Sequence, residues 1–199
     1  MAPFIDLLTS QLFVLGFSGL IMAYLAFCAL NGKGKDNDAK IRSGSAVLAV
    51  LGFYTVVTGL YGQFTWPLPG SYNILFYDMY TLWGLFIVGL AWSLHSRAKL
   101  RPLGLFATLL GFMSLCYGIT GYDLGLTQSP IALLGLYSLF GISGVLGYPI
   151  TVLLESDGKN RQAIWKALGV AFVVALILGS LLAILIGTSA VPAHLASPP

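Results

Sequence analysis

The sequence predicts an all-α, polytopic membrane protein with six transmembrane helices that form a pseudo-repeated set of helical hairpins. Three observations predict this fold class. Hydrophobic residues make up 57% of the 199 residues and charged residues only 9%, whereas soluble domains carry roughly 25% charged residues. The apolar residues form long continuous runs, which are typical of membrane-spanning helices rather than of the short alternating strands of a β-barrel. The basic residues are confined to short segments between those runs.

Windows of about 20 apolar residues predict each helix in turn. The six expected spans are 9–31, 44–65, 74–95, 102–121, 131–154 and 163–188. They make up one transmembrane domain over residues 1–190. The Pro- and Ala-rich segment 191–199 is expected to be a flexible C-terminal tail, because chain ends are often poorly ordered.

The basic residues indicate how the helices are oriented. All ten lie in the segments "NGKGKDNDAKIRSG", "HSRAKLR" and "ESDGKNRQAIWK". Because basic residues accumulate in cytoplasmic loops, we expect these three loops in the cytoplasm and both termini outside, in a multi-pass protein of the cell (plasma) membrane. Short basic clusters at helix ends fit contact with anionic lipid headgroups, so the positive net charge does not indicate a nucleic-acid partner.

An internal repeat relates the middle helices. Small residues recur 59 positions apart, where Ser45, Gly52, Gly59 and Gly62 correspond to Gly104, Gly111, Gly118 and Gly121. The helices that follow share "YTLWG" (80–84) and "YSLFG" (137–141). Small residues let helix backbones approach closely in lipid, so the stripes that contain Gly52 and Gly59, or Gly111 and Gly118, are expected to be packing faces. The alternative is a coincidence of small residues, which are common in membrane helices.

The last helix carries a longer ridge of small residues at every fourth position: Ala167, Ala171, Ala175, Gly179, Ala183 and Gly187. Such a ridge predicts close packing against another helix. The partner is a helix of the same chain or one of a neighbouring subunit, and we expect a homo-oligomer.

An acidic residue, Asp78, lies inside the apolar run "NILFYDMYTLWGLF". An ionisable residue at this depth usually faces the protein interior or a water-filled cavity. With Asp6 and Asp123 it lies on the side of the membrane that has no Lys or Arg, so the three are predicted to line an outer mouth. Two alternatives compete for Asp78: a cap on the positive N-terminal end of its helix, or a hydrogen bond to a tyrosine such as Tyr61 or Tyr80.

Three aromatic residues stand at equivalent positions of the repeat: Phe13, Trp83 and Phe140. If they converge on a common axis, they form an apolar constriction that blocks hydrated ions. Alternatively, they are ordinary core or lipid-facing aromatics.

The sequence provides few groups for catalysis. His95 and His194 are the only histidines and fall at opposite ends of the predicted bundle, so they cannot ligate one haem between them. The chain has no CxxC or HExxH motif, no GxSxG in a suitable context and no Gly-rich phosphate loop. We therefore predict no catalytic residue, no metal, no cofactor and no enzymatic activity.

The segment "PGSYNILFYDMYTLWG" (69–84) resembles the signature region of an uncharacterised family of archaeal and bacterial membrane proteins, a domain of unknown function. This resemblance covers nearly the whole chain and implies no activity. In size, span number and hairpin repetition the chain is also similar to the acid-gated urea and amide channel family, and in size and span number to the acetate-uptake family. The urea-channel likeness implies three hairpins around one pore per subunit, with aromatic constrictions and a ring of subunits.

Two functional hypotheses follow. The first is a membrane channel or facilitator for a small neutral solute or weak acid, gated when external pH protonates the mouth acids. The second is a non-catalytic accessory subunit of a larger respiratory or other membrane complex, in which the ridge of the last helix docks a foreign partner.

Overall fold

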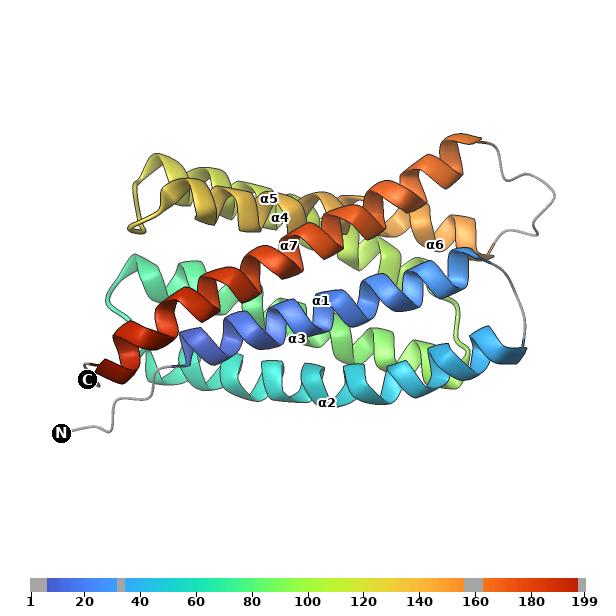
Figure 1. Cartoon of the computed structure of the whole chain (residues 1–199), viewed down its shortest axis with the longest axis horizontal. Helices are drawn as coiled ribbons and strands as arrows, with labels where there is room; N and C mark the ends of the chain where they lie inside the picture. The colour runs from blue at the N-terminus through green and yellow to red at the C-terminus, as the bar shows by residue number, and fades with distance from the viewer. Residues whose placement is uncertain (1–6, 32–34, 156–162, 197–199) are drawn as a thin grey trace.

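The structure is a computed structural model that describes residues 7–31, 35–155 and 163–196 (Figure 1). Its helices are α1 (Leu8–Leu30), α2 (Lys35–Thr65), α3 (Ser71–Ser96), α4 (Arg101–Asp123), α5 (Pro130–Val145), α6 (Gly147–Glu155) and α7 (Ala163–Ala196). Six spans of these helices, with α5 and α6 counted as one, are long and apolar enough to cross a membrane. The prediction of an all-α protein with six transmembrane helices is confirmed.

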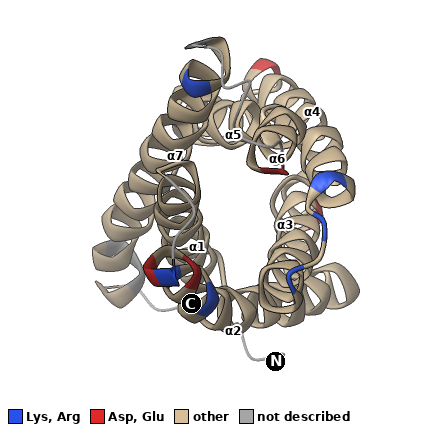
Figure 2. Cartoon of the chain, turned by 90° about the vertical axis from the view of Figure 1, so that its right-hand side faces the viewer, with Lys and Arg blue, Asp and Glu red and all other residues tan. Residues whose placement is uncertain are grey.

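The helices form a closed ring of three antiparallel pairs. The pairs with the most extensive contacts are α2 with α3, α4 with α5, and α1 with α7. Further contacts of α1 with α2, α3 with α4, and α5 with α7 join neighbouring pairs. Viewed along the bundle, the helices surround a central axis (Figure 2). The first and last helices of the chain therefore close the ring as its third pair.

The two ends of the bundle differ in charge. Lys and Arg residues gather at the end where α2 and α4 begin, which we call the basic end (Figure 2). The helix α1 begins and α7 ends at the opposite end, which we call the terminal end (Figure 1). At the basic end the Glu155 carboxylate accepts hydrogen bonds from the backbone N–H groups of Leu100 and Arg101 and pairs with Arg101 Nε at 3.0 Å. This contact joins the end of α6 to the start of α4.

The glycine stripes lie where paired helices touch. A methyl group added at Gly111 would stand 2.4 Å from the backbone nitrogen of Val145, and one added at Gly118 would stand 2.6 Å from Tyr137 Cβ. In the equivalent pair, methyl groups at Gly52 and Gly59 would stand 3.0 Å from backbone atoms of α3. Positions related by the sequence repeat therefore make the same kind of contact in two consecutive hairpins.

The fifth span, expected to be continuous, is broken between α5 and α6. Pro149 has no backbone N–H, so it cannot donate to the carbonyl of Val145 four residues earlier. The Thr108 hydroxyl of α4 shares its one proton between that carbonyl (3.2 Å) and the Gly104 carbonyl of its own helix (3.1 Å), and it accepts a hydrogen bond from the Tyr148 N–H (3.2 Å). One side chain thus provides partners for two backbone groups at the break.

The helices α2 and α7 extend furthest beyond their expected bounds. The predicted second span starts at residue 44, but α2 begins at Lys35, because its charged first turns lie beyond the apolar window and acids at Asp36 and Asp38 suit a helix N-terminus. The helix α7 continues to Ala196 with Pro192 inside it, so the segment expected to be a flexible tail from residue 191 is helical over its described part.

Candidate functional site

A cavity of about 1050 Å³ runs through the ring of helices. Its lining extends from Ile41 and Leu100 at the basic end to Gln128 and Ser189 at the terminal end. On α1 the lining residues lie on one face of the helix and extend over about 30 Å from Leu8 to Ala29, with a gap between Leu15 and Met22. The volume lies just above the range of about 300–1,000 Å³ for small-molecule sites. We call this cavity the lumen.

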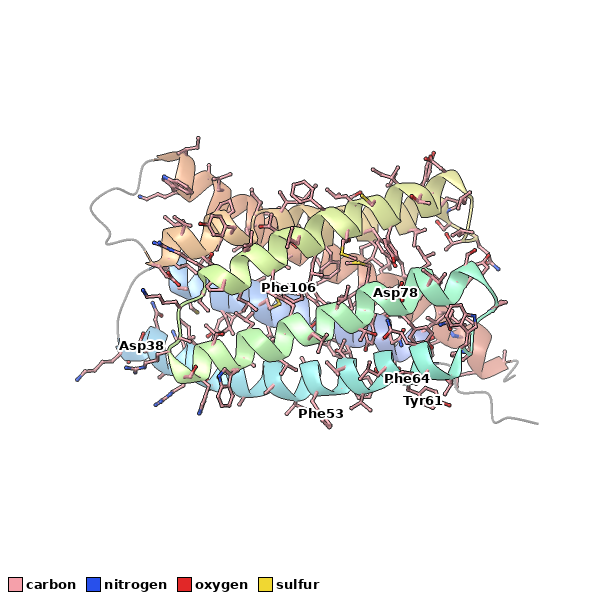
Figure 3. All side chains as sticks on the ribbon, turned by 180° about the vertical axis from the view of Figure 1, so that it is seen from behind. Asp38, Phe53, Tyr61, Phe64, Asp78 and Phe106 are labelled. Carbon is pink, nitrogen blue, oxygen red and sulfur yellow. The ribbon has the colours of Figure 1, made fainter. Side chains whose placement is uncertain are left out.

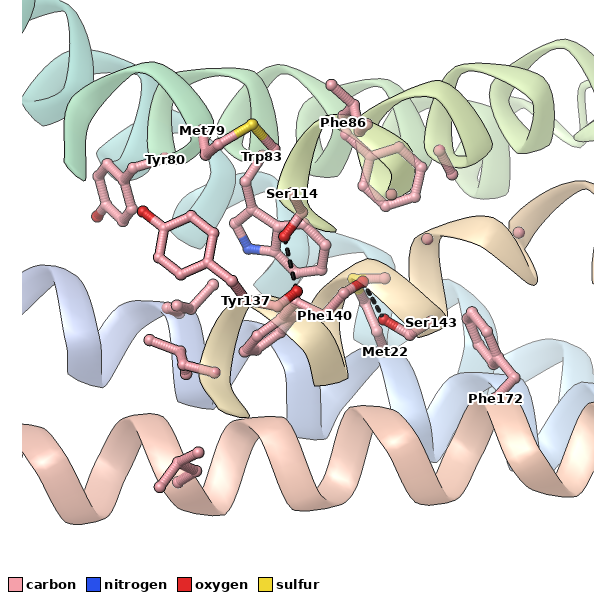
Figure 4. A pocket seen from close by; sticks show the side chains of 18 of the residues that line it. Met22, Met79, Tyr80, Trp83, Phe86, Ser114, Tyr137, Phe140, Ser143 and Phe172 are labelled. Atoms are coloured by element: carbon pink, nitrogen blue, oxygen red, sulfur yellow. Dashed lines mark hydrogen bonds between the residues drawn. The ribbon is translucent and has the colours of Figure 1, made fainter. Parts of the chain in front are cut away.

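Most of the lumen is lined by apolar side chains. The polar residues in its described lining are Gln11, Asp38, Tyr80, Ser114, Thr127, Gln128, Ser129, Tyr137, Ser143, Thr151 and Ser189. Several of these hydroxyls already have backbone partners: Ser114 donates to the Tyr137 carbonyl and Ser143 to the Phe140 carbonyl, both at 2.8 Å (Figure 4). Internal hydrogen bonds therefore reduce the polarity that part of this wall presents to the lumen.

Two of the three predicted aromatic residues meet in the lumen. Trp83 and Phe140 both belong to its lining, and their rings pack edge to face with centroids 5.2 Å apart (Figure 4). The indole N–H of Trp83 donates to Ser18 Oγ on α1 at 3.1 Å, which fixes the ring. Phe86 packs on the same indole at a centroid distance of 5.7 Å. These rings lie near the middle of their spans.

The structure places the third aromatic residue elsewhere. Phe13 stacks on Phe17 of its own helix, with centroids 6.1 Å apart, and lies against Gly187 of α7. The α1 residues nearest to the aromatic pair are instead Ser18, which binds Trp83, and Gly19, which faces the Phe140 ring. The helices α1 and α7 come from opposite ends of the chain and do not form a consecutive hairpin. The repeat spacing therefore did not predict which residues of α1 lie level with Trp83 and Phe140.

The three predicted mouth acids have different surroundings. Asp78 accepts hydrogen bonds from Gln63 Nε2 (3.1 Å) and from the Tyr117 hydroxyl (3.0 Å), and thereby connects α2, α3 and α4. It lies at the seam between α3 and α4 (Figure 3) and is not among the described lining residues of the lumen. Asp123 is exposed at the end of α4. Asp6 lies outside the described residues.

Neither alternative interpretation of Asp78 describes its contacts fully. Because α3 begins at Ser71, Asp78 stands beyond the first turn and does not cap the helix. A tyrosine is its partner, but it is Tyr117 rather than Tyr61 or Tyr80. The Tyr80 hydroxyl oxygen instead lies 3.5 Å from the Thr58 hydroxyl oxygen.

Sequence reasoning missed two lumen residues at the terminal end. The Nε2 atom of Gln11 and the Oγ1 atom of Thr127 are buried, and neither has a hydrogen-bond partner in the described part of the chain. Both residues line the lumen. Gln11 could have been recognised as an uncharged polar residue inside the apolar run "TSQLFVLGF", whereas Thr127 lies in a loop whose position depends on the fold.

The ridge of α7 is used within the chain. Methyl groups added at Gly179 and Gly187 would stand 3.2 Å from Leu139 Cβ of α5 and 3.3 Å from Leu12 Cβ of α1, respectively. Ala175 and Ala183 are also buried, while Ala167, nearer the basic end, is exposed. The middle of this ridge is therefore occupied by the protein's own helices.

Comparisons with curated proteins and with solved structures found no match. A family model matches residues 1–197, and its description is a protein of unknown function, DUF981. Since this match covers almost the entire chain, the protein belongs to the DUF981 family.

Proposed function

We propose that the protein is a membrane channel or facilitator for small neutral solutes or protonated weak acids, with the lumen as the passage. The observation that carries this proposal is the extent of the lumen, whose lining reaches from the basic end to the terminal end between six membrane-spanning segments. A bundle that served only as a structural anchor would need no such internal space, because helix interiors normally pack to high density.

The chemistry of the lining supports a preference for uncharged solutes. Asp38 at the basic end is the one charged side chain among the described lining residues. Moving an ion through the apolar middle would require removing its hydration shell without replacement, which is energetically costly. The packed rings of Trp83 and Phe140 lie at that point. An apolar segment of this kind opposes hydrated ions.

The geometry gives less support to gating by Asp78. Its carboxylate already accepts two hydrogen bonds at the seam between α3 and α4, so its protonation would act on helix packing rather than on the lumen wall.

We infer from the positions of the basic residues that the basic end faces the cytoplasm in the plasma membrane. Homo-oligomerisation stays a prediction. Phe53 on the outside of α2, 69% exposed, is suited to lipid or to another copy (Figure 3).

The test is solute-driven swelling of vesicles that contain the purified protein. Urea, acetamide, glycerol and acetic acid would be compared with protein-free vesicles by stopped-flow light scattering. Uptake of one or more of these solutes above the protein-free rate, with no conductance to ions, supports the proposal. Rates equal to those of protein-free vesicles for all four solutes would refute it.

The accessory-subunit alternative loses its main support in this fold, because α1 and α5 cover the middle of the α7 ridge. Purification in mild detergent distinguishes the two functions. Co-purification of other subunits in a fixed ratio supports the alternative, and a preparation of this chain alone supports the channel.

A further inference from the structure

We propose that Gln11 and Thr127 form a head-group site at the terminal end of the lumen for a single-chain amphiphile. Its head is an uncharged hydrogen-bond acceptor, a carbonyl or a protonated carboxyl group, and its apolar chain lies along the lumen. This inference rests on the proposed function and names the class of molecule that the lumen takes.

The first reason is that two residues of the lumen lining carry buried polar atoms without a hydrogen-bond partner among the described residues. Gln11 is 4% exposed, and its Nε2 atom has no partner among the described residues. The Thr127 Oγ1 atom is buried and likewise unpartnered there. A side-chain amide carries two N–H donors, and a hydroxyl carries one donor and two acceptor positions. Since buried polar groups are almost always hydrogen-bonded, a ligand that supplies an acceptor at this point is favoured.

The second reason is the position of these groups relative to the apolar wall. Gln11 lies in the first turn of α1 and shares its lining face with Leu12 and Leu15, while Thr127 comes from the loop between α4 and α5. The lining then continues through Met22 and Phe86 to Ala29 at the other end of α1. Polar groups at one end of an apolar wall, whose α1 residues extend over about 30 Å, match a molecule with one polar end and a long chain.

The third reason is the charge of the lining. No Lys or Arg belongs to the described part of the lumen wall, and its acid, Asp38, lies at the basic end, away from Gln11. An anionic head would therefore have no counter-ion where Gln11 and Thr127 stand, and an uncharged head needs none. The volume of about 1050 Å³ also exceeds what one acetamide or urea molecule requires.

The test is equilibrium binding of radiolabelled hexadecanamide to the purified protein in lipid nanodiscs. Gln11→Leu and Thr127→Val each remove one of the unpartnered groups at nearly constant volume. Loss of one net hydrogen bond is expected to weaken binding by about threefold to tenfold. Thr65→Val serves as the matched control, because the Thr65 hydroxyl is exposed and bonds its own helix. Melting temperature and elution profile would show that each variant is folded.

Hexadecyl sulfate and acetamide test the head and the chain separately. Both are expected to compete poorly, the first because its head is charged and the second because it has no chain. Undetectable hexadecanamide binding, unchanged binding in both lumen variants, or equal competition by hexadecyl sulfate would each overturn the inference. If the protein conducts solutes but does not bind hexadecanamide, this site is refuted and the channel is not. If the protein binds hexadecanamide in a way that depends on Gln11 but conducts no solute, the channel is refuted and the site is not.

Discussion

The carboxylate of Asp78 on α3 accepts a hydrogen bond from the hydroxyl of Tyr117 on α4, at 3.0 Å. This bond crosses from one hairpin of the ring to the next. Gln63 donates to the same carboxylate from α2, and one turn earlier the Leu75 carbonyl accepts from the Tyr137 hydroxyl of α5. Four helices are thereby connected near the terminal end, which gives Asp78 a structural role that can be measured apart from transport.

Replacing Asp78 with leucine is expected to lower the free energy of unfolding by about 1–3 kcal/mol, because Gln63 and Tyr117 lose their shared hydrogen-bond acceptor. Asp123→Asn is the control, since Asp123 is exposed, and it should change stability by less than about 0.5 kcal/mol. Chemical unfolding in detergent micelles measures both. Solute flux per folded molecule should be retained in Asp78→Leu, and a selective loss of flux without loss of stability would contradict the structural role.

Gly111→Ala is expected to destabilise the protein by about 1–3 kcal/mol, the range for overpacking a close contact. The new methyl group would meet the backbone of Val145 at 2.4 Å and the Gly141 carbonyl at 2.6 Å, and backbone atoms of a helix cannot turn aside as a side chain does. At Gly135 the nearest atom is the flexible end of Leu182, at 3.3 Å. Gly135→Ala should therefore be neutral or stabilising through its higher helix propensity. Equal effects at both positions would argue against the close contact of α4 with α5.

Thr108→Val is expected to destabilise the broken fifth span by about 1–3 kcal/mol, because the Val145 carbonyl and the Tyr148 N–H lose their shared partner. Pro149→Ala restores a backbone donor for Val145. In that background Thr108→Val should cost less, and a double-mutant cycle measures the difference. If the effects of the two substitutions on the free energy of unfolding simply add, the Thr108 hydroxyl does not compensate for the proline.

Trp83→Ala is expected to raise the flux of the larger solutes in the swelling assay, because the indole packs on Phe140 in the middle of the lumen wall. Trp92→Ala on the same helix is the matched control, since Trp92 is 72% exposed on the outside of the bundle, and its flux should equal that of the unmodified protein. Phe13→Ala should affect stability rather than solute preference, because Phe13 stacks on Phe17 away from the described lining. A larger change in the flux of the larger solutes with Phe13→Ala than with Trp83→Ala would place the constriction at Phe13.

The site was only partly accessible from the sequence. The echo of "YTLWG" in "YSLFG" gives Trp83 and Phe140 equivalent positions, and their rings are in contact in the structure, because both helices follow a glycine-striped partner at nearly the same spacing. The Phe13 ring stacks on Phe17 instead, since α1 pairs with α7 across the whole length of the chain. The partner of Asp78 and the unpartnered amide of Gln11 depend on which helices adjoin each other, and residue types alone do not specify that.

Six membrane-spanning helices with the positive charge at one end could be predicted from the amino-acid sequence, because hydropathy and charge act over a single helix and its flanks. The closure of these helices into a ring around a lumen, and the contacts that Asp78 makes between helices beside it, became known from the folded bundle. Apolar helices gain little hydrophobic energy from each other within lipid. Their arrangement therefore depends on local fits such as those at Gly111 and Gly118, whose partners become known only when the whole bundle is assembled.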